Sequence, residues 1–202
     1  MNSTHTHTKS VANTHKLAEN LSHHFLIATP KMPDPRFSQS VIYLCHHDDK
    51  GTLGLVINAP IIDTTVGQLF DNLDIEVNAP KLRHSYPLLG GPIYEEVGFV
   101  LHTGQAVWAS SFSIAENICL TTSLDILKSL ANQGGPTHFQ LFLGHASWAK
   151  GQLKKEIDAG DWLICPADSQ LIFDTPYDER WHKAGQKLGV DLDFFSDDIG
   201  HA

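Results

Sequence analysis

Two apolar segments joined by a polar turn constrain the fold of this chain more than any other feature of its sequence. Residues 40–45 are rich in β-branched and aromatic side chains, and residues 53–57 are almost wholly apolar. The sequence Asp48-Asp49-Lys50-Gly51 between them has turn composition and predicts a β-hairpin. Because both strands are apolar on both faces, we expect them at the centre of a sheet that is covered on each side.

Short strand-like and helix-like segments alternate at uneven intervals along the rest of the chain. Apolar composition predicts further strands at residues 25–28, 86–89, 97–102, 118–120, 138–143 and 162–165. Capping signals predict helices that begin after Thr65 and after Thr122, and apolar spacing predicts a helix over residues 144–159. A last helix is expected with Thr175 as N-cap and Pro176 in its first position. This pattern favours an α+β domain with a mixed, strongly curved sheet over a regular βαβ repeat.

Length and composition fit one folded domain. The chain has 202 residues, 42% of them hydrophobic and 18% charged, and this balance excludes disorder for most of its length. We predict a flexible arm, rich in His and Thr, over residues 1–22. Residues 23–202 are expected to form a single domain that ends in a frayed, acidic tail.

The same sequence predicts a soluble, cytoplasmic protein without a membrane partner. No apolar run approaches the roughly 18 residues that span a bilayer, and the polar N-terminus lacks the apolar core of a signal peptide. The three cysteines, Cys45, Cys119 and Cys165, are far apart and predict neither a disulfide framework nor a thiolate zinc site.

The net charge of −9 argues against nucleic acid as a direct partner. An acidic protein repels phosphate backbones unless its cations gather on one face. The most cationic helix-like stretch, residues 150–156, also contains an acid, and no recognition helix or basic stripe is evident. Direct DNA binding by a transcriptional regulator therefore remains only an alternative.

Motifs of established catalytic and cofactor sites are missing. The chain has no phosphate loop, no G-x-G-x-x-G, no H-E-x-x-H and no G-x-S-x-G. His5 and His7 in the arm, and Cys45, His47 and Asp49 near the hairpin turn, are the residue types that bind metals. Neither group supplies three or four ligands fixed by their surroundings, and turn chemistry already explains the second. We therefore predict no catalytic residues, no cofactor and no specific metal site.

Four polar residues are candidates for a binding surface. A loop stiffened by three prolines carries Asp34 and Arg36, and an acid beside a guanidinium can orient a polar ligand. The alternative for this pair is an internal ion pair that fastens the loop. Asn58 either joins the same surface or caps the end of a strand. His102 ends an apolar strand, where it is either a general base or a core histidine.

Several stretches, in order along the chain, carry a resemblance to a known family. They are Asp34-Pro35-Arg36-Phe37-Ser38-Gln39-Ser40-Val41, Gly51-Thr52-Leu53-Gly54-Leu55-Val56-Ile57-Asn58-Ala59-Pro60, Gly90-Gly91-Pro92 with Gly98-Phe99-Val100-Leu101-His102, Gly151-Gln152-Leu153, and Leu171-Ile172-Phe173-Asp174-Thr175-Pro176 leading to Arg180-Trp181. Together they resemble the AlgH/YqgE family of bacterial proteins over nearly the whole chain from about His24.

Two stretches depart from that family pattern, at three positions in all. Gly144-His145-Ala146-Ser147-Trp148 stands where the family reads Gly-Tyr-Ala-Gly-Trp, and Ala59 stands where a basic residue is common. If these positions line a pocket, we expect its ligand to differ in this chain.

The resemblance implies a compact α+β domain with a barrel-like sheet flanked by helices. It also implies a proposed regulatory role and no established enzymatic activity. We therefore predict a non-catalytic binding or regulatory protein that acts through a protein partner or a small ligand at Asp34, Arg36, Asn58 and His102. The first alternative is an unrecognised enzyme that uses His102 or His46 as acid or base beside Asp34. The second is a regulator that binds DNA directly.

Overall fold

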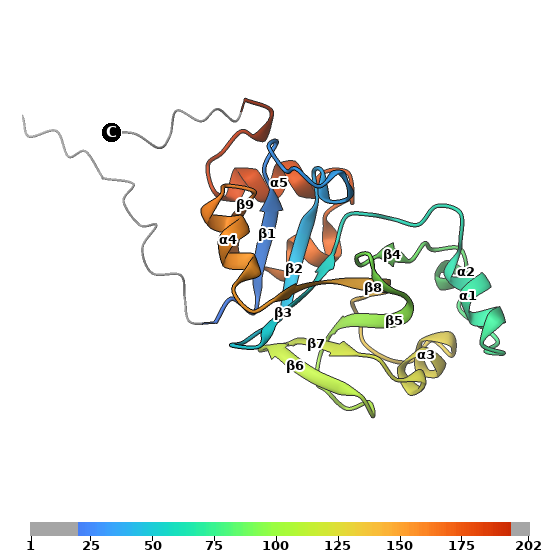
Figure 1. Ribbon diagram of the computed structural model, residues 1–202. Coiled ribbons are helices and arrows are strands. Elements are labelled where there is room, and N and C mark those ends of the chain that lie inside the picture. Colours follow the sequence, from blue (N-terminus) through green and yellow to red (C-terminus); the bar gives the residue numbers. More distant parts are fainter. Residues whose placement is uncertain (1–19, 195–202) are drawn as a thin grey trace, which may run out of the picture.

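One curled β-sheet organises the computed structural model, which describes residues 20–194 (Figure 1). Its strands are β1 (His24–Ala28), β2 (Val41–His47), β3 (Gly51–Val56), β4 (Leu88–Leu89), β5 (Ile93–Thr103), β6 (Ser111–Ala115), β7 (Ile118–Thr121), β8 (Phe139–Ala149) and β9 (Trp162–Pro166). They follow the order β6-β7-β5-β8-β3-β2-β1-β9, and β4 pairs with β8. The sheet is mixed, because the β4–β8 pair is parallel and the other pairs are antiparallel.

Helices cover both halves of this sheet. They are η1 (Pro35–Phe37), α1 (Val66–Asn72), α2 (Pro80–Arg83), α3 (Leu124–Ala131), α4 (Gln152–Asp158), the π-helical turn η2 (Gln170–Asp174), α5 (Arg180–Lys187) and η3 (Leu192–Phe194). α5 packs against β1 and β2, and α4 packs against β8 and β9. α1, α2 and α3 lie together at the other end of the molecule (Figure 1).

The predicted central hairpin is confirmed. β2 and β3 pair antiparallel with Tyr43 opposite Leu55, and a bulge between Leu44 and His46 shifts the register near the turn. Both strands lie inside the strand order, and residues 41–45 are fully or almost fully buried. The apolar composition of both faces therefore placed this hairpin correctly.

β8 joins the two halves of the sheet because its ends have different partners. Residues 139–143 pair with β5, and residues 146–149 pair with β3. At Gly144, between these two stretches, φ is 68°, and a Cβ there would lie 2.5 Å from the carbonyl oxygen of Gly91. A left-handed backbone in such close contact accepts only glycine, so this residue allows the strand to bend.

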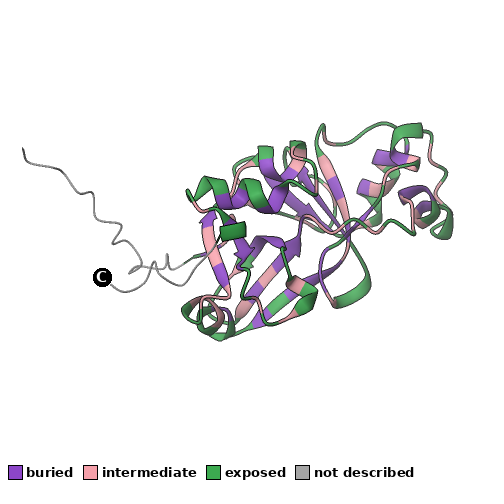
Figure 2. Cartoon of the chain, turned by 90° about the horizontal axis from the view of Figure 1, so that it is seen from above, coloured by how far each residue is buried: buried purple, intermediate pink, exposed green. Residues whose placement is uncertain are grey.

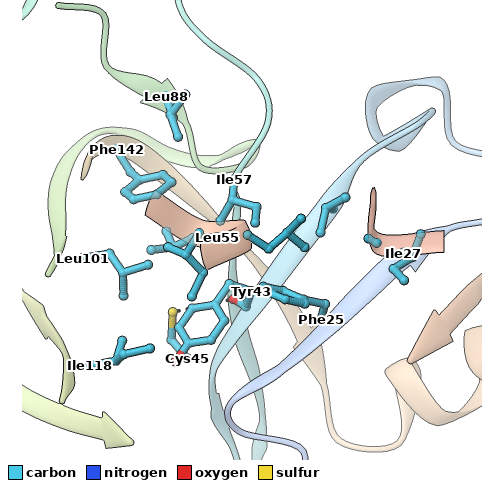
Figure 3. Packing of buried hydrophobic residues seen from close by; sticks show 14 of the residues in the cluster. Phe25, Ile27, Tyr43, Cys45, Leu55, Ile57, Leu88, Leu101, Ile118 and Phe142 are labelled. Atoms are coloured by element: carbon cyan, nitrogen blue, oxygen red, sulfur yellow. Dashed lines mark hydrogen bonds between the residues drawn. The ribbon is translucent and has the colours of Figure 1, made fainter. Parts of the chain in front are cut away.

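The main part of the apolar core is one cluster of buried side chains. Burial is concentrated in the strands and in the helix faces that contact them (Figure 2). Figure 3 shows side chains from both halves of the sheet meeting in one cluster, among them Phe25, Tyr43, Leu55, Leu101, Ile118 and Phe142. α5 closes this cluster with Trp181 and Ala184. The predicted α+β class, with a mixed and strongly curved sheet, is confirmed.

The predicted helix over residues 144–159 is wrong in its first half. β8 continues as a strand to Ala149, and only Gln152–Asp158 is helical. Ala146 and Trp148 are buried while Ser147 and Ala149 are exposed. This alternation is typical of a strand that has one face toward the core and the other toward solvent. Alanines at 146 and 149 fit helical spacing equally well, so composition alone could not separate the two patterns.

The predicted start of the last helix is also wrong. Thr175 does not cap α5, because its backbone N–H and its hydroxyl both donate to the carbonyl of Gln170 and end η2. α5 begins only at Arg180. The helix starts after Thr65 and Thr122 are confirmed: Thr65 forms a capping box with Gln68, and α3 begins at Leu124. β6 and α2 had no predicted counterpart.

The predicted arm falls mostly outside the described residues, and so does the tail beyond residue 194. The described packing includes Leu21, which is buried in the cluster around Trp148 and Trp162. Ser22 also contributes, because its hydroxyl accepts a hydrogen bond from the backbone N–H of His47. Within residues 20–194, no helix combines the length and the apolar character needed to cross a bilayer.

Candidate functional site

Asp34 and Arg36 bind each other on the surface. Arg36 donates from Nη2 to Asp34 Oδ2 at 2.7 Å and from Nε to Oδ1 at 3.0 Å. Asp34 also caps η1 by accepting from the backbone N–H of Arg36. These hydrogen bonds from Arg36 lower the pKa of the Asp34 carboxyl. The geometry fits a loop fastened by its own ion pair, and a role in ligand binding stays a prediction.

Asn58 fastens the end of the same loop to the central hairpin. Its Oδ1 accepts from the backbone N–H of Val41 at 2.9 Å, and its Nδ2 donates to the carbonyl of Gln39 at 2.9 Å. The side chain therefore bridges the segment after β3 and the start of β2. Asn58 also lines a surface hollow near Arg180. Its role in ligand binding stays a prediction.

His102 is enclosed in the other half of the sheet. Its Nδ1 donates to the carbonyl of Thr103 at 3.0 Å, so Nε2 is the acceptor that faces the hydroxyl of Thr121 at 2.8 Å. The Thr121 hydroxyl in turn lies 2.5 Å from that of Ser111, and Trp108 packs edge-on against the imidazole at 4.9 Å. Burial lowers the pKa of His102, which keeps the ring neutral.

The four predicted residues do not form one cluster. The contacts of His102 stay within β5, β6, β7 and the loop between β5 and β6, whereas Asp34, Arg36 and Asn58 lie around the start of β2. His46 is at the opposite end of β2 from Asp34, where its Nε2 lies 3.1 Å from Asp48. The structure therefore does not join either histidine to Asp34.

The described residues also hold no metal cluster: no three His, Cys, Asp or Glu side chains between residues 20 and 194 are grouped around one point. Cys45 is buried, and this burial raises the pKa of its thiol. The imidazole of His47 meets the hydroxyl of Thr52 at 2.7 Å. His5 and His7 lie outside the described residues.

A large hollow lies elsewhere, where α2, the end of α3, β8 and η2 meet. It has a volume of about 800 Å³, and a second hollow of about 630 Å³ adjoins it near the start of α5. Gln140, Phe173 and Tyr177 line both hollows, and we call the two together the groove. The walls of the first hollow are mainly apolar and aromatic, and include Leu88, Leu130, Phe139, Phe173, Tyr86 and Tyr177.

Arg180 forms the floor of the second hollow. Its residue exposure is only 1%. Its Nε donates to the carbonyl of Thr175 at 2.9 Å, and its Nη1 donates to the carbonyl of Ile57 and to Gln140 Oε1. The guanidinium also lies 4.5 Å from the ring centre of Tyr177. These contacts come from three parts of the chain, at residues 57, 140 and 175–177, and fix the plane of the group.

This cation has no internal counter-ion. No Asp or Glu among the described residues lies within 4 Å of Arg180. Burial lowers the pKa of the guanidinium to about 10, so it remains positively charged at neutral pH. Buried charges are usually paired with an opposite charge, and an unpaired one is costly. Arg180 is therefore the most unusual polar group of the described fold.

Three donors around this cation have no partner among residues 20–194. They are Nη2 of Arg180, Nε2 of Gln140 and the hydroxyl of Tyr177, all on residues that line the groove. Every fully enclosed side-chain nitrogen or oxygen of the described residues has a hydrogen-bond partner. The three unpaired donors are therefore not fully enclosed, and the residues that carry them line the groove.

Sequence reasoning missed Arg180, although a signal was present. Trp181, Ala184 and Leu188 follow helical spacing, and Arg180 falls on the same face beside Trp181. A charged residue on the buried face of a helix marks a polar contact inside the fold. The signal could not show that the contact is with carbonyl oxygens rather than with a carboxylate.

Comparison with known proteins assigns the chain to a family. A family model described as AlgH-like matches residues 25–193. The chain belongs to the AlgH-like family. The resemblance noted in its motifs is confirmed.

Two curated relatives of this AlgH-like chain are named UPF0301 proteins. One from Psychrobacter sp. (strain PRwf-1) is 60% identical over 185 residues, which cover 91% of this chain and 98% of the relative. Another, from Cupriavidus metallidurans, is 44% identical over 183 residues, which cover 91% of this chain and 96% of the relative.

Two solved structures share the fold. The solution structure of the AlgH protein from Pseudomonas aeruginosa matches with a TM-score of 0.76 at 37% identity, over 96% of this chain and 100% of that chain. A crystal structure of a protein from Corynebacterium diphtheriae matches with a TM-score of 0.67 at 26% identity, over 87% of this chain and 91% of that chain.

Neither departure from the AlgH/YqgE pattern lies in the walls of the groove. His145 stacks on Tyr94 with ring centres 5.9 Å apart, and its Nδ1 lies 3.1 Å from the carbonyl of Ile93. Ala59 sits between Asn58 and Pro60, which both line the second hollow. Only the second departure is therefore placed where it can affect a ligand of the groove.

Proposed function

We propose that this AlgH-like protein is a non-catalytic, cytoplasmic binding protein that holds a small ligand in the groove. One observation carries the proposal: Gln140, Phe173 and Tyr177 join an apolar hollow to a hollow whose floor is a buried cation. Aromatic and apolar walls with a few fixed polar atoms are the usual composition of small-molecule sites.

The lining of the groove supports binding rather than catalysis. Neither hollow is lined by an imidazole or a thiol, and the carboxylates of Asp174 and Asp178 are exposed at its rim. General acid–base catalysis needs a titratable group held within reach of the reacting atoms. At the rim, His138 Nδ1 lies 3.7 Å from Asp174 Oδ1, and this exposed pair is the one an enzyme at the groove would use.

A regulatory role would follow from this binding indirectly. The net charge of −9 disfavours contact with a phosphate backbone, so a bound ligand would change how the protein meets a protein partner. The exposed pair of Asp34 and Arg36 is the proposed place for that contact, apart from the groove. Asn58 is proposed to act at the groove itself, and His102 in a supporting role inside the fold.

The proposal is tested by mapping where small molecules bind. A fraction of bacterial metabolites below about 3 kDa is added to ¹⁵N-labelled protein, and backbone amide shifts are followed by NMR. We expect shifts around Tyr86, Phe139 and Tyr177. The variant Lys81→Trp should remove them, because Lys81 lines the first hollow and the indole would fill it.

The matched control is Lys150→Trp, which makes the same change at an exposed position away from the groove. Shifts that survive Lys81→Trp, or that gather only around Asp34 and Arg36, contradict the proposal. Chemical conversion of a metabolite that stops in His138→Ala would establish an enzyme at the groove instead, which is a different site from the predicted alternative with His102 or His46 beside Asp34. Salt-sensitive binding to duplex DNA would establish the alternative of a regulator that binds DNA directly.

A further inference from the structure

We infer that the groove selects a small organic carboxylate with an apolar body, and that Arg180 and Gln140 bind its carboxylate group. This inference rests on the proposed function and names the class of ligand. It begins from a cation that the fold encloses but does not neutralise.

The position of the free guanidinium edge is fixed before any ligand arrives. Nε and Nη1 of Arg180 are held by the carbonyls of Thr175 and Ile57, and the ring of Tyr177 covers one face of the group. Only Nη2 is left without an acceptor, and it is accessible from the second hollow. An acceptor placed there meets a charged donor that needs no rearrangement, which strengthens the hydrogen bond.

Gln140 supplies a second donor beside the first. Its Oε1 accepts from Nη1 of Arg180 at 3.2 Å, and arginine can only donate, so the other amide atom, Nε2, must point away from this contact. Nε2 has no acceptor among the described residues, although only 9% of Gln140 is exposed. In this proposal each of the two donors meets one oxygen of the carboxylate, and the Tyr177 hydroxyl, on a residue that lines the same hollow, is a third donor.

The charges around the second hollow favour a carboxylate over a phosphate group. Arg180 is the only cation in its lining, whereas Asp174 and Asp178 are exposed at its rim. A dianion would meet two negative charges with a single cation to offset them, whereas a monocarboxylate needs only that one cation.

The first hollow suits the rest of such a ligand. It continues past Gln140, Phe173 and Tyr177 into walls formed by Leu88, Leu130 and Phe139. An apolar or aromatic body of a few carbon atoms would lose water there while its carboxylate stays on Arg180. Burial of that body supplies affinity, and the paired donors supply specificity.

The test uses 4-phenylbutanoate as a probe, with its uncharged amide and inorganic phosphate for comparison. NMR titration of the full chain gives a Kd for each. We expect the carboxylate to bind at least about tenfold more tightly than the amide, as loss of one charge-assisted hydrogen bond implies. We expect phosphate to produce no shifts in the groove.

Gln140→Glu is the decisive variant because it adds the missing internal carboxylate in nearly the same shape. It should weaken 4-phenylbutanoate binding at least about tenfold while the thermal midpoint is kept or raised. The matched control, Gln186→Glu, makes the same charge change at an exposed position of α5 and should leave Kd unchanged. Equal Kd values for wild type and Gln140→Glu would overturn the inference.

The remaining outcomes separate this inference from the proposed function. If metabolites shift groove residues but 4-phenylbutanoate does not, the carboxylate class is wrong and the binding groove stands. If neither the metabolites nor 4-phenylbutanoate shift the groove residues, both the proposed function and this inference are wrong. A pentapeptide with C-terminal phenylalanine that binds tenfold more tightly than 4-phenylbutanoate, and loses binding on amidation, would reassign the site to a peptide terminus and overturn the small acid.

Discussion

The guanidinium of Arg180 donates from Nη1 to the backbone carbonyl of Ile57, a residue 123 positions earlier in the sequence. Ile57 follows the central hairpin, and Arg180 is the first residue of the helix that closes the main core. The bond therefore ties α5 to the middle of the sheet. Since Nη2 of the same group faces the groove, one side chain connects the stability of the fold to its candidate site.

Arg180→Met should destabilise the fold. The carbonyl oxygens of Ile57 and Thr175 would lose their buried donor, and we expect the free energy of unfolding to fall by about 3 kcal/mol. Urea unfolding followed by circular dichroism measures this loss. Arg36→Met removes a guanidinium from an exposed ion pair and should leave the urea midpoint unchanged. If both variants lost the same free energy of unfolding, the buried hydrogen bonds of Arg180 would stabilise the fold no more than the exposed ion pair of Arg36 does.

Glu156 should stabilise the other face of the sheet through two tryptophans. Its Oε2 accepts from the indole N–H of Trp148 at 2.8 Å and of Trp162 at 2.9 Å. Glu156→Ala leaves both donors without this acceptor, so we expect the free energy of unfolding to fall by about 2 kcal/mol. Thermal unfolding followed by tryptophan fluorescence checks the loss. Asp158→Ala, which removes an exposed carboxylate from the end of the same helix, should change the midpoint little.

Much of the sheet was predictable because its strongest signals are local. The hairpin of β2 and β3 has apolar faces and a turn sequence within a few residues, and Thr65 with Gln68 encodes a helix start in four positions. β8 was partly misread because its strand character from residue 146 onward depends on pairing with β3, which lies about ninety residues earlier. Pairing with a strand so distant in sequence does not change the local spacing of apolar residues, so that spacing could not predict it.

The candidate site was harder to predict than the sheet for a related reason. Asp34 and Arg36 stand two positions apart, so their proximity is visible in the sequence, and they form the surface pair considered as an alternative. Arg180, Gln140 and Ile57 are distant in sequence and meet only in the folded chain. A groove that contains a cation without a counter-ion can therefore be recognised only from the folded structure, where the hydrogen-bond partners of Arg180 are known.

Gly144 should tolerate no side chain. Its φ of 68° is strained for other residues, and a Cβ would lie 2.5 Å from the carbonyl oxygen of Gly91. We expect Gly144→Ala to lower the free energy of unfolding by about 2 kcal/mol or more, measured by urea unfolding. Gly98→Ala, on the paired strand β5, is the control because a Cβ there meets nothing within 4 Å. If the two alanines cost the same, the bend in β8 does not depend on glycine.

His102 should make the fold sensitive to mild acid. Burial lowers its pKa below the model-peptide value of 6.5, so below pH 6.5 the unfolded chain takes up a proton before the folded chain does. The stabilising effect of the neutral ring is complete above pH 6.5 and is lost as pH falls toward the lower folded pKa. While the unfolded state holds this one extra proton, stability falls by about 1.4 kcal/mol for each pH unit.

Urea unfolding between pH 7.5 and about 5 measures this slope. We expect it to be shallower in His102→Gln, which keeps a polar group beside Thr121 but cannot titrate. Burial also lowers the pKa of His23, His47 and His145, so a residual slope should remain in this variant. A slope in His102→Gln identical to that of the wild type would mean that the enclosed imidazole takes up its proton as readily in the folded chain as in the unfolded one.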